Sequence, residues 1–66
     1  MKVIVNGAPC EVPDHATVFD LVQKLGLSVE TVVVQRNEEI VDRERFGATV
    51  LAPDDALELV RLVGGG

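Results

Sequence analysis

The chain has 66 residues and a formal net charge of −5, and 47% of its residues are hydrophobic. A chain of this length forms one small domain that buries only about 60% of the surface exposed by its unfolded form, and this hydrophobic content excludes an intrinsically disordered protein. The negative charge disfavours direct binding to nucleic acid or to an anionic membrane, because both carry negative charge themselves.

The first segment of the chain predicts a β-hairpin. Residues 2–5 are rich in β-branched side chains and predict a strand, and Asn6-Gly7 is a strong signal for a two-residue hairpin turn. In residues 8–12 the apolar residues Ala8, Cys10 and Val12 alternate with Pro9 and Glu11. This alternation predicts a second strand whose apolar face includes Cys10. Pro9 cannot donate a hydrogen bond to a neighbouring strand, so we expect this strand to lie at an edge of the sheet.

The hydrophobic period then changes to that of a helix over residues 18–25. Four apolar residues share one helical face: Val18, Leu21, Val22 and Leu25. Thr17 is expected to be the N-cap residue, with Asp20 three positions on in a capping-box arrangement, and Gly26 stands where a C-terminal cap glycine belongs. A helix this short depends on packing for its stability, so we expect its apolar face to lie on the sheet.

The middle of the chain predicts strands separated by polar turns. Residues 31–35 predict a strand, and which of its valines face the core is left open. Residues 37–39 predict a turn, and residues 40–41 predict a short returning strand. The charged residues 42–45 predict a single helical turn, after which Phe46 is expected to face inward.

The last third of the chain completes the predicted fold. Residues 49–51 predict another short strand, residues 53–55 a turn that is capped by its two aspartates, and residues 57–63 the last and longest strand. The first and last strands are the most apolar and are expected at the centre of the sheet. This order predicts a single α+β domain over residues 1–66, a ubiquitin-like β-grasp with a mixed sheet, one main helix on one face, and a flexible tail at residues 64–66.

The side chains with catalytic or metal-binding chemistry are few and scattered. Cys10 is expected to be a small core residue and His15 a solvated turn residue. A protein metal site usually needs three or four ligands, so we expect no metal, no intrinsic cofactor and no enzymatic activity, with catalysis by Cys10 as the disfavoured alternative. A single cysteine cannot form an internal disulfide, which favours a reducing compartment, and we expect the cytoplasm.

The last predicted strand has two different faces. Four residues are expected on the face that packs on the helix or at its rim: Leu57, Leu59, Arg61 and Val63. Val60 and Leu62 are expected on the uncovered face, where exposed apolar side chains form a candidate docking patch for a partner protein. Beyond them, Gly64 and Gly65 lack a Cβ and therefore fit a narrow slot, and Gly66 presents a main-chain carboxylate.

The sequence resembles the ThiS family, the sulfur carriers of thiamine thiazole biosynthesis. The resemblance rests on Asn6-Gly7, on TVFDLVQKLGL at residues 17–27, on VVVQRNEEIVDRERF at residues 32–46 and on the final ELVRLVGGG. The chain departs from the family in two places. The family often has proline at the position of Asp42, and it often has Asp-Gly-Asp where this chain has Pro53-Asp54-Asp55.

The resemblance implies a mechanism and a set of partners. A ubiquitin-activating-like adenylyltransferase of the ThiF type adenylates Gly66, and a persulfide that derives from a cysteine desulfurase converts it to a thiocarboxylate. A thiazole synthase of the ThiG type then takes the sulfur. Gly64 and Gly65 thread into the partner, and Arg43, which matches a family position, pairs with a partner carboxylate. ATP is consumed by the partner, so the carrier, expected to be a monomer alone, needs no cofactor of its own.

Two alternatives stay open from the sequence. The first is a sulfur carrier with the same chemistry in another pathway, for molybdopterin, tRNA thiolation or cysteine synthesis. The length and the NEEIVDR segment at residues 37–43 favour the thiamine branch. The second is a non-catalytic β-grasp binding module, which the negative charge and the glycine tail disfavour.

Overall fold

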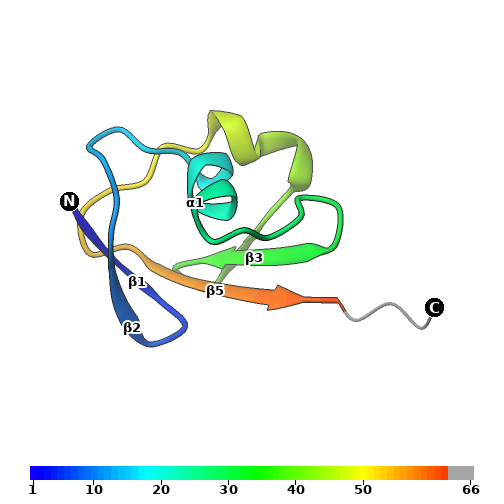
Figure 1. Ribbon diagram of the computed structural model, residues 1–66, viewed down its shortest axis with the longest axis horizontal. Helices are drawn as coiled ribbons and strands as arrows, with labels where there is room; N and C mark the ends of the chain where they lie inside the picture. The colour runs from blue at the N-terminus through cyan, green and yellow to red at the C-terminus, as the bar shows by residue number, and fades with distance from the viewer. Residues whose placement is uncertain (63–66) are drawn as a thin grey trace.

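The protein folds as a five-stranded mixed sheet that is covered on one face by a single α-helix (Figure 1). The computed structural model describes residues 1–62. In chain order the elements are β1 (Lys2–Val5), β2 (Ala8–Glu11), α1 (Val18–Lys24), β3 (Val32–Arg36), β4 (Glu39–Val41), the 3₁₀ helix η1 (Arg43–Ala48) and β5 (Ala56–Arg61). The strand order is β2-β1-β5-β3-β4, with β1 and β5 parallel and the other neighbours antiparallel. The last strand therefore lies at the centre of the sheet with β1 beside it, as predicted.

The β1–β2 hairpin turns at Asn6 and Gly7, as the sequence predicts. Both residues have left-handed backbone, with φ of 49° and 84°, which matches the twist of a two-residue hairpin. The side chain of Asn6 has a second role, because its Oδ1 accepts the N–H of Leu59 at 2.9 Å and its Nδ2 donates to the carbonyl of Leu59 at 3.2 Å. β2 is an edge strand, and this confirms the position expected for Pro9.

Helix α1 begins with the predicted capping box. The N–H of Asp20 donates to Thr17 Oγ1 at 3.1 Å, and the N–H of Thr17 donates to Asp20 Oδ2 at 2.9 Å. The helix ends at Lys24, one residue earlier than predicted, and Leu25 is half-exposed rather than part of the core. Leu25 is the C-cap residue, and Gly26 follows it with φ of +71°, which confirms the predicted cap glycine. The prediction that Leu25 continues the buried face is wrong, because the helix ends before it.

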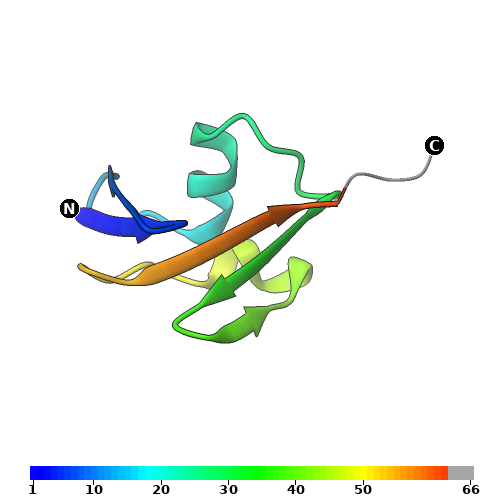
Figure 2. The ribbon, with the colours of Figure 1, turned by 90° about the horizontal axis from the view of Figure 1, so that it is seen from below.

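The register between β3 and β5 decides which valines of β3 are buried. Val34 pairs with Leu59 and both face the helix, so Val32 and Val34 are buried while Val33 lies on the opposite face. The core consists of aliphatic residues and one phenylalanine: Val3, Val12, Ala16, Val18, Leu21, Val22, Val32, Val34, Phe46, Leu51, Leu57 and Leu59. This one-sided burial leaves the outer face of the sheet uncovered by any helix of the described fold (Figure 2).

The segment between β4 and β5 differs from the prediction in two ways. The charged helical turn is longer than expected, since η1 covers six residues, and it places Phe46 in the core as predicted. The predicted strand at residues 49–51 is wrong, because this segment forms one isolated bridge, between Val50 and Thr17. Its backbone pairs with the residues just before α1, so it lies beside the start of the helix and away from the sheet.

Candidate functional site

Strand β5 leads directly to the residues for which the sequence predicts a function. It is held on both sides, by β1 in parallel pairing up to Leu57 and by β3 in antiparallel pairing up to Arg61. Leu57 and Leu59 are buried on the face toward α1, as predicted. Figure 2 shows β5 running obliquely across the sheet and extending well beyond the β1–β2 hairpin. The predicted carrier and threading residues at positions 64–66, and the core position expected for Val63, lie outside the described residues.

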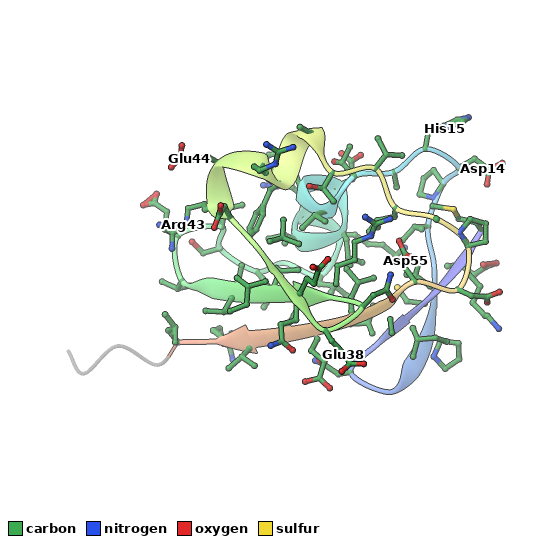
Figure 3. The ribbon with its side chains drawn as sticks, turned by 180° about the vertical axis from the view of Figure 1, so that it is seen from behind. Asp14, His15, Glu38, Arg43, Glu44 and Asp55 are labelled. Atoms are coloured by element: carbon green, nitrogen blue, oxygen red, sulfur yellow. The ribbon has the colours of Figure 1, made fainter. Side chains whose placement is uncertain are left out.

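The end of β5 is supported by a loop that Arg43 holds in place. The N–H of Leu62 donates to the carbonyl of Thr31 at 2.7 Å, which continues the pairing on the β3 side to the last described residue. The guanidinium of Arg43 donates from Nε to the carbonyl of Val29 at 2.7 Å and from Nη2 to that of Glu30 at 3.0 Å (Figure 3). Arg43 therefore stabilises the loop beside the strand end, and its pairing with a partner carboxylate stays a prediction.

Exposed apolar side chains lie on the outer face of the sheet near the same strand end. Val60 is 55% exposed and Leu62 is 53% exposed, which confirms the predicted exposure of both. The sheet register adds two residues that the sequence analysis missed, because Val33 pairs with Val60 and Ile40, at 65% exposure, lies further along the same face. We call these four residues the outer patch. Apolar side chains grouped in this way mark interaction surfaces in soluble proteins.

Asp55 is the buried charged residue among the described ones, and it fixes the start of β5. Its Oδ2 accepts hydrogen bonds from Arg36 Nε and from the N–H of Ala52, both at 2.8 Å, and its Oδ1 accepts from Asn37 Nδ2 at 3.0 Å (Figure 3). Burial by itself raises the pKa of Asp55, but these hydrogen bonds and the charge of Arg36 outweigh it, so the pKa lies below its usual value. The carboxylate is thus ionised at neutral pH.

The role of Asp55 extends beyond the turn cap that the sequence predicts. The bond from Ala52 N–H is the predicted cap, and the contacts with Arg36 and Asn37 join β5 to the β3–β4 turn, 18 to 19 residues away in the chain. Asn37 also accepts the N–H of Ala56 at 2.9 Å. The only sequence signal for these contacts is the presence of polar residues at two turns, which does not specify their pairing.

Cys10 and His15, the two residues with the most reactive side chains, lie in different segments: Cys10 is in β2 and His15 is in the turn before α1. Cys10 faces the core but is only half-buried, and His15 is exposed in the turn before α1 with φ of 70°, as expected of a solvated turn residue. Among residues 1–62, no group of three or more His, Cys, Asp or Glu side chains is arranged to hold a metal ion. Nor does any helix in this part of the chain have the length and apolar character needed to cross a bilayer.

The sheet order with a central last strand and one helix on one face defines a ubiquitin-like β-grasp protein, as predicted. The structure is similar over its full length to the crystal structure of the thiamine biosynthesis protein ThiS from Geobacter metallireducens, with a TM-score of 0.84, 36% sequence identity and complete coverage of both chains. The ThiS family model matches residues 3–66, and the chain belongs to the ThiS family.

Two curated relatives are informative for different reasons. The chain is 40% identical over 53 residues to the sulfur carrier protein ThiS of Bacillus subtilis, and the match covers 80% of each chain. It is also 41% identical over 66 residues to the thiazole synthase of Magnetococcus marinus, a match that covers all of this chain but 20% of that protein. The chain thus spans about a fifth of the length of the thiazole synthase that it matches.

Proposed function

We propose that this protein is a sulfur carrier of thiamine biosynthesis whose reactive group is the main-chain carboxylate of Gly66. A ThiF-type adenylyltransferase transfers AMP from ATP to this carboxylate and releases pyrophosphate. A persulfide, supplied ultimately by a cysteine desulfurase, then displaces AMP and forms an acyl disulfide. A second thiol attacks the S–S bond of this acyl disulfide, which releases the thiocarboxylate and leaves the two thiol sulfurs joined as a disulfide. The observation that carries the proposal is the anchoring of β5, which is paired on the β3 side up to Leu62 and therefore provides a firm base for Gly64 and Gly65 to thread into the partner.

The acceptor of the sulfur is proposed to be a thiazole synthase of the ThiG type. The thiazole synthase of Magnetococcus marinus contains a segment similar to the whole of this chain, which supports a direct functional connection between the two kinds of protein. A second thiazole synthase, from Paramagnetospirillum magneticum, is 35% identical over 66 residues and is matched over 20% of its length. These relatives favour thiamine synthesis over the other sulfur-transfer pathways.

We infer that the protein acts as a carrier and that catalysis belongs to its partners. In the proposed reactions the chain contributes one carboxylate, while the partner enzyme binds ATP and provides the catalytic groups, so the carrier needs no cofactor. The chain is expected to be a monomer on its own. We place it in the cytoplasm, where ATP and a reducing environment for persulfide sulfur are both present.

The intact mass of the protein tests the proposed function directly. After incubation with ATP, a persulfide donor and the ThiF-type adenylyltransferase, we expect the mass change that corresponds to replacement of one oxygen by one sulfur. Fragmentation should place this change at Gly66. An unchanged mass, with an adenylyltransferase that activates its own known carrier in parallel, would refute the proposal.

The outer patch is the surface proposed to dock on the adenylyltransferase, and Val60 lies at its centre. Val60→Asp introduces a charge that must be desolvated in the complex, so we expect kcat/KM for adenylation to fall about 30-fold or more, as at an interface hot spot. The free energy of unfolding should fall by no more than about 1 kcal/mol, because the side chain is exposed in the free protein. Leu62→Asp should behave in the same way.

Val50→Asp is the matched control, because Val50 is 50% exposed and lies beside the start of α1, away from the outer patch. This variant should be adenylated at nearly the normal rate. The assignment of the docking face would be contradicted if Val50→Asp lowered kcat/KM for adenylation as much as Val60→Asp. It would also be contradicted if both Val60→Asp and Leu62→Asp were unfolded.

A further inference from the structure

The C-terminal part of β5 has an open edge on the side of β1. The N–H of Leu62 donates to the carbonyl of Thr31, and the N–H of Asn37 donates to the carbonyl of Ala56, so the even-numbered residues of β5 direct their backbone hydrogen bonds to β3. The odd-numbered residues therefore direct their backbone N–H and C=O groups toward β1. The backbone groups of Leu57, Leu59 and Arg61 therefore need hydrogen-bond partners on the β1 side.

The partners on the β1 side end before Arg61. The carbonyl of Leu57 accepts the N–H of Asn6 at 2.8 Å, and both backbone groups of Leu59 pair with the side-chain amide of Asn6. Arg61 is the next residue that points to this side. Within residues 1–62, β1 pairs with β5 only up to Leu57, because the paired part of β1 ends at Val5. No described strand lies on that side of the C-terminal end of β5 (Figures 1 and 2).

The space next to this edge is accessible. On that side β5 extends well beyond the β1–β2 hairpin (Figure 2). An unpaired N–H and C=O on a regular strand form a template for pairing with another strand. The open edge is also continuous with the outer patch, since Val60 and Leu62 flank Arg61 in the chain.

We propose that an extended segment of the adenylyltransferase pairs with the main chain of Arg61 at this open edge, in the place that β1 would occupy if it continued past Asn6. The inference rests on the proposed function and names how the partner recognises the carrier. Main-chain pairing of this kind adds a strand to a sheet independently of side-chain identity. Arg61 is five residues before Gly66 in the sequence, and five extended residues span about 17 Å. Pairing at Arg61 therefore fixes the point from which the tail reaches the active site.

N-methylation of the Arg61 amide removes the donor and blocks the edge while it keeps the guanidinium. The 66-residue chain is short enough for chemical synthesis with this single change. We expect kcat/KM for pyrophosphate release, measured with Mg-ATP and the ThiF-type adenylyltransferase, to fall at least tenfold. N-methylation of Glu11 is the matched control, because the N–H of Val12 donates to Met1 and the N–H of Glu11 therefore points outward from the β2 edge. The Glu11 control should stay within twofold of the unmodified protein.

Hydrogen exchange of the unmodified protein gives a second measurement that does not depend on how the modified chain folds. The exchange rate of the Arg61 amide should fall at least tenfold when the adenylyltransferase is bound. Equal kcat/KM for the unmodified chain and both modified chains, or an unchanged exchange rate in the complex, overturns the edge pairing while the sulfur-carrier proposal stands. If sedimentation instead shows a dimer that only N-methylation of Arg61 disrupts, with kcat/KM unchanged, the edge binds a second copy and the proposal is wrong. An unmodified protein that releases no pyrophosphate refutes the proposed function itself.

Discussion

Addition of one alanine after Gly66 is expected to abolish sulfur loading. The added residue converts the Gly66 carboxylate into a peptide bond and moves the new carboxylate about 3.3 Å farther from the base of the tail. A displacement of about 1 Å at a reacting group already costs on the order of a hundredfold in rate, and the new Cβ must also enter a slot that we propose is shaped for glycine. The measurement is the intact mass after incubation with ATP, a persulfide donor and the adenylyltransferase.

A glycine added at the same position separates the effect of length from that of the side chain. Both extended proteins should remain unloaded if the position of the carboxylate is decisive. Each should also unfold at the same denaturant concentration as the original chain, because the change alters none of the residues 1–62 that form the described fold. Loading of the alanine variant at the original rate would refute the assignment of Gly66 as the carrier residue.

Replacement of Asp55 by alanine is expected to lower the free energy of unfolding by about 2 to 4 kcal/mol, since it leaves Arg36, Asn37 and the N–H of Ala52 without their acceptor in a mostly buried site. Urea denaturation of both proteins at neutral pH measures this difference. Asp14→Ala is the control, because Asp14 is exposed and forms only a surface contact with the N-terminal amine, so its loss should cost no more than about 1 kcal/mol.

The pH dependence of this difference tests whether the ionised form of Asp55 is the stabilising one. The pKa of Asp55 is lower in the folded protein than in the unfolded chain, so its stabilisation is complete above about pH 5 and is lost as the pH falls through the folded value. The gap in unfolding free energy between the original chain and Asp55→Ala should therefore narrow in acid. A gap that stays constant down to about pH 3 would contradict this interpretation.

The elements that local sequence signals define were predicted well. The turn at Asn6-Gly7 and the capping box of Thr17 and Asp20 each depend on residues within three positions of one another, so the sequence alone specifies them. The alternation along β5 likewise predicted that Leu57 and Leu59 face the helix while Val60 is exposed. These features set the fold class and located part of the outer patch, whose docking role is proposed.

The predictions that failed involve contacts between distant parts of the chain. Residues 49–51 have the β-branched character of a strand, but their backbone pairs with the segment before α1, where no sheet exists. The contacts of Asp55 with Arg36 and Asn37, and of Arg43 with the loop before β3, are set by the tertiary fold. Residue type at each position gives no indication of these partners, so the open edge at Arg61 also became visible only once the register of β5 was known.

The position of β5 between β1 and β3 links the integrity of the fold to its proposed reactivity. Without β5 the sheet order leaves two separate hairpins, β1–β2 and β3–β4, with no strand between them. The strand that joins these halves is also the one that carries the tail, and its pairing partners come from the start and the middle of the described sequence. A chain that is still incomplete, or one in which β5 has detached, has no rigid base for Gly66. The proposed activating enzyme would therefore discriminate between folded and unfolded carriers through the geometry of this strand.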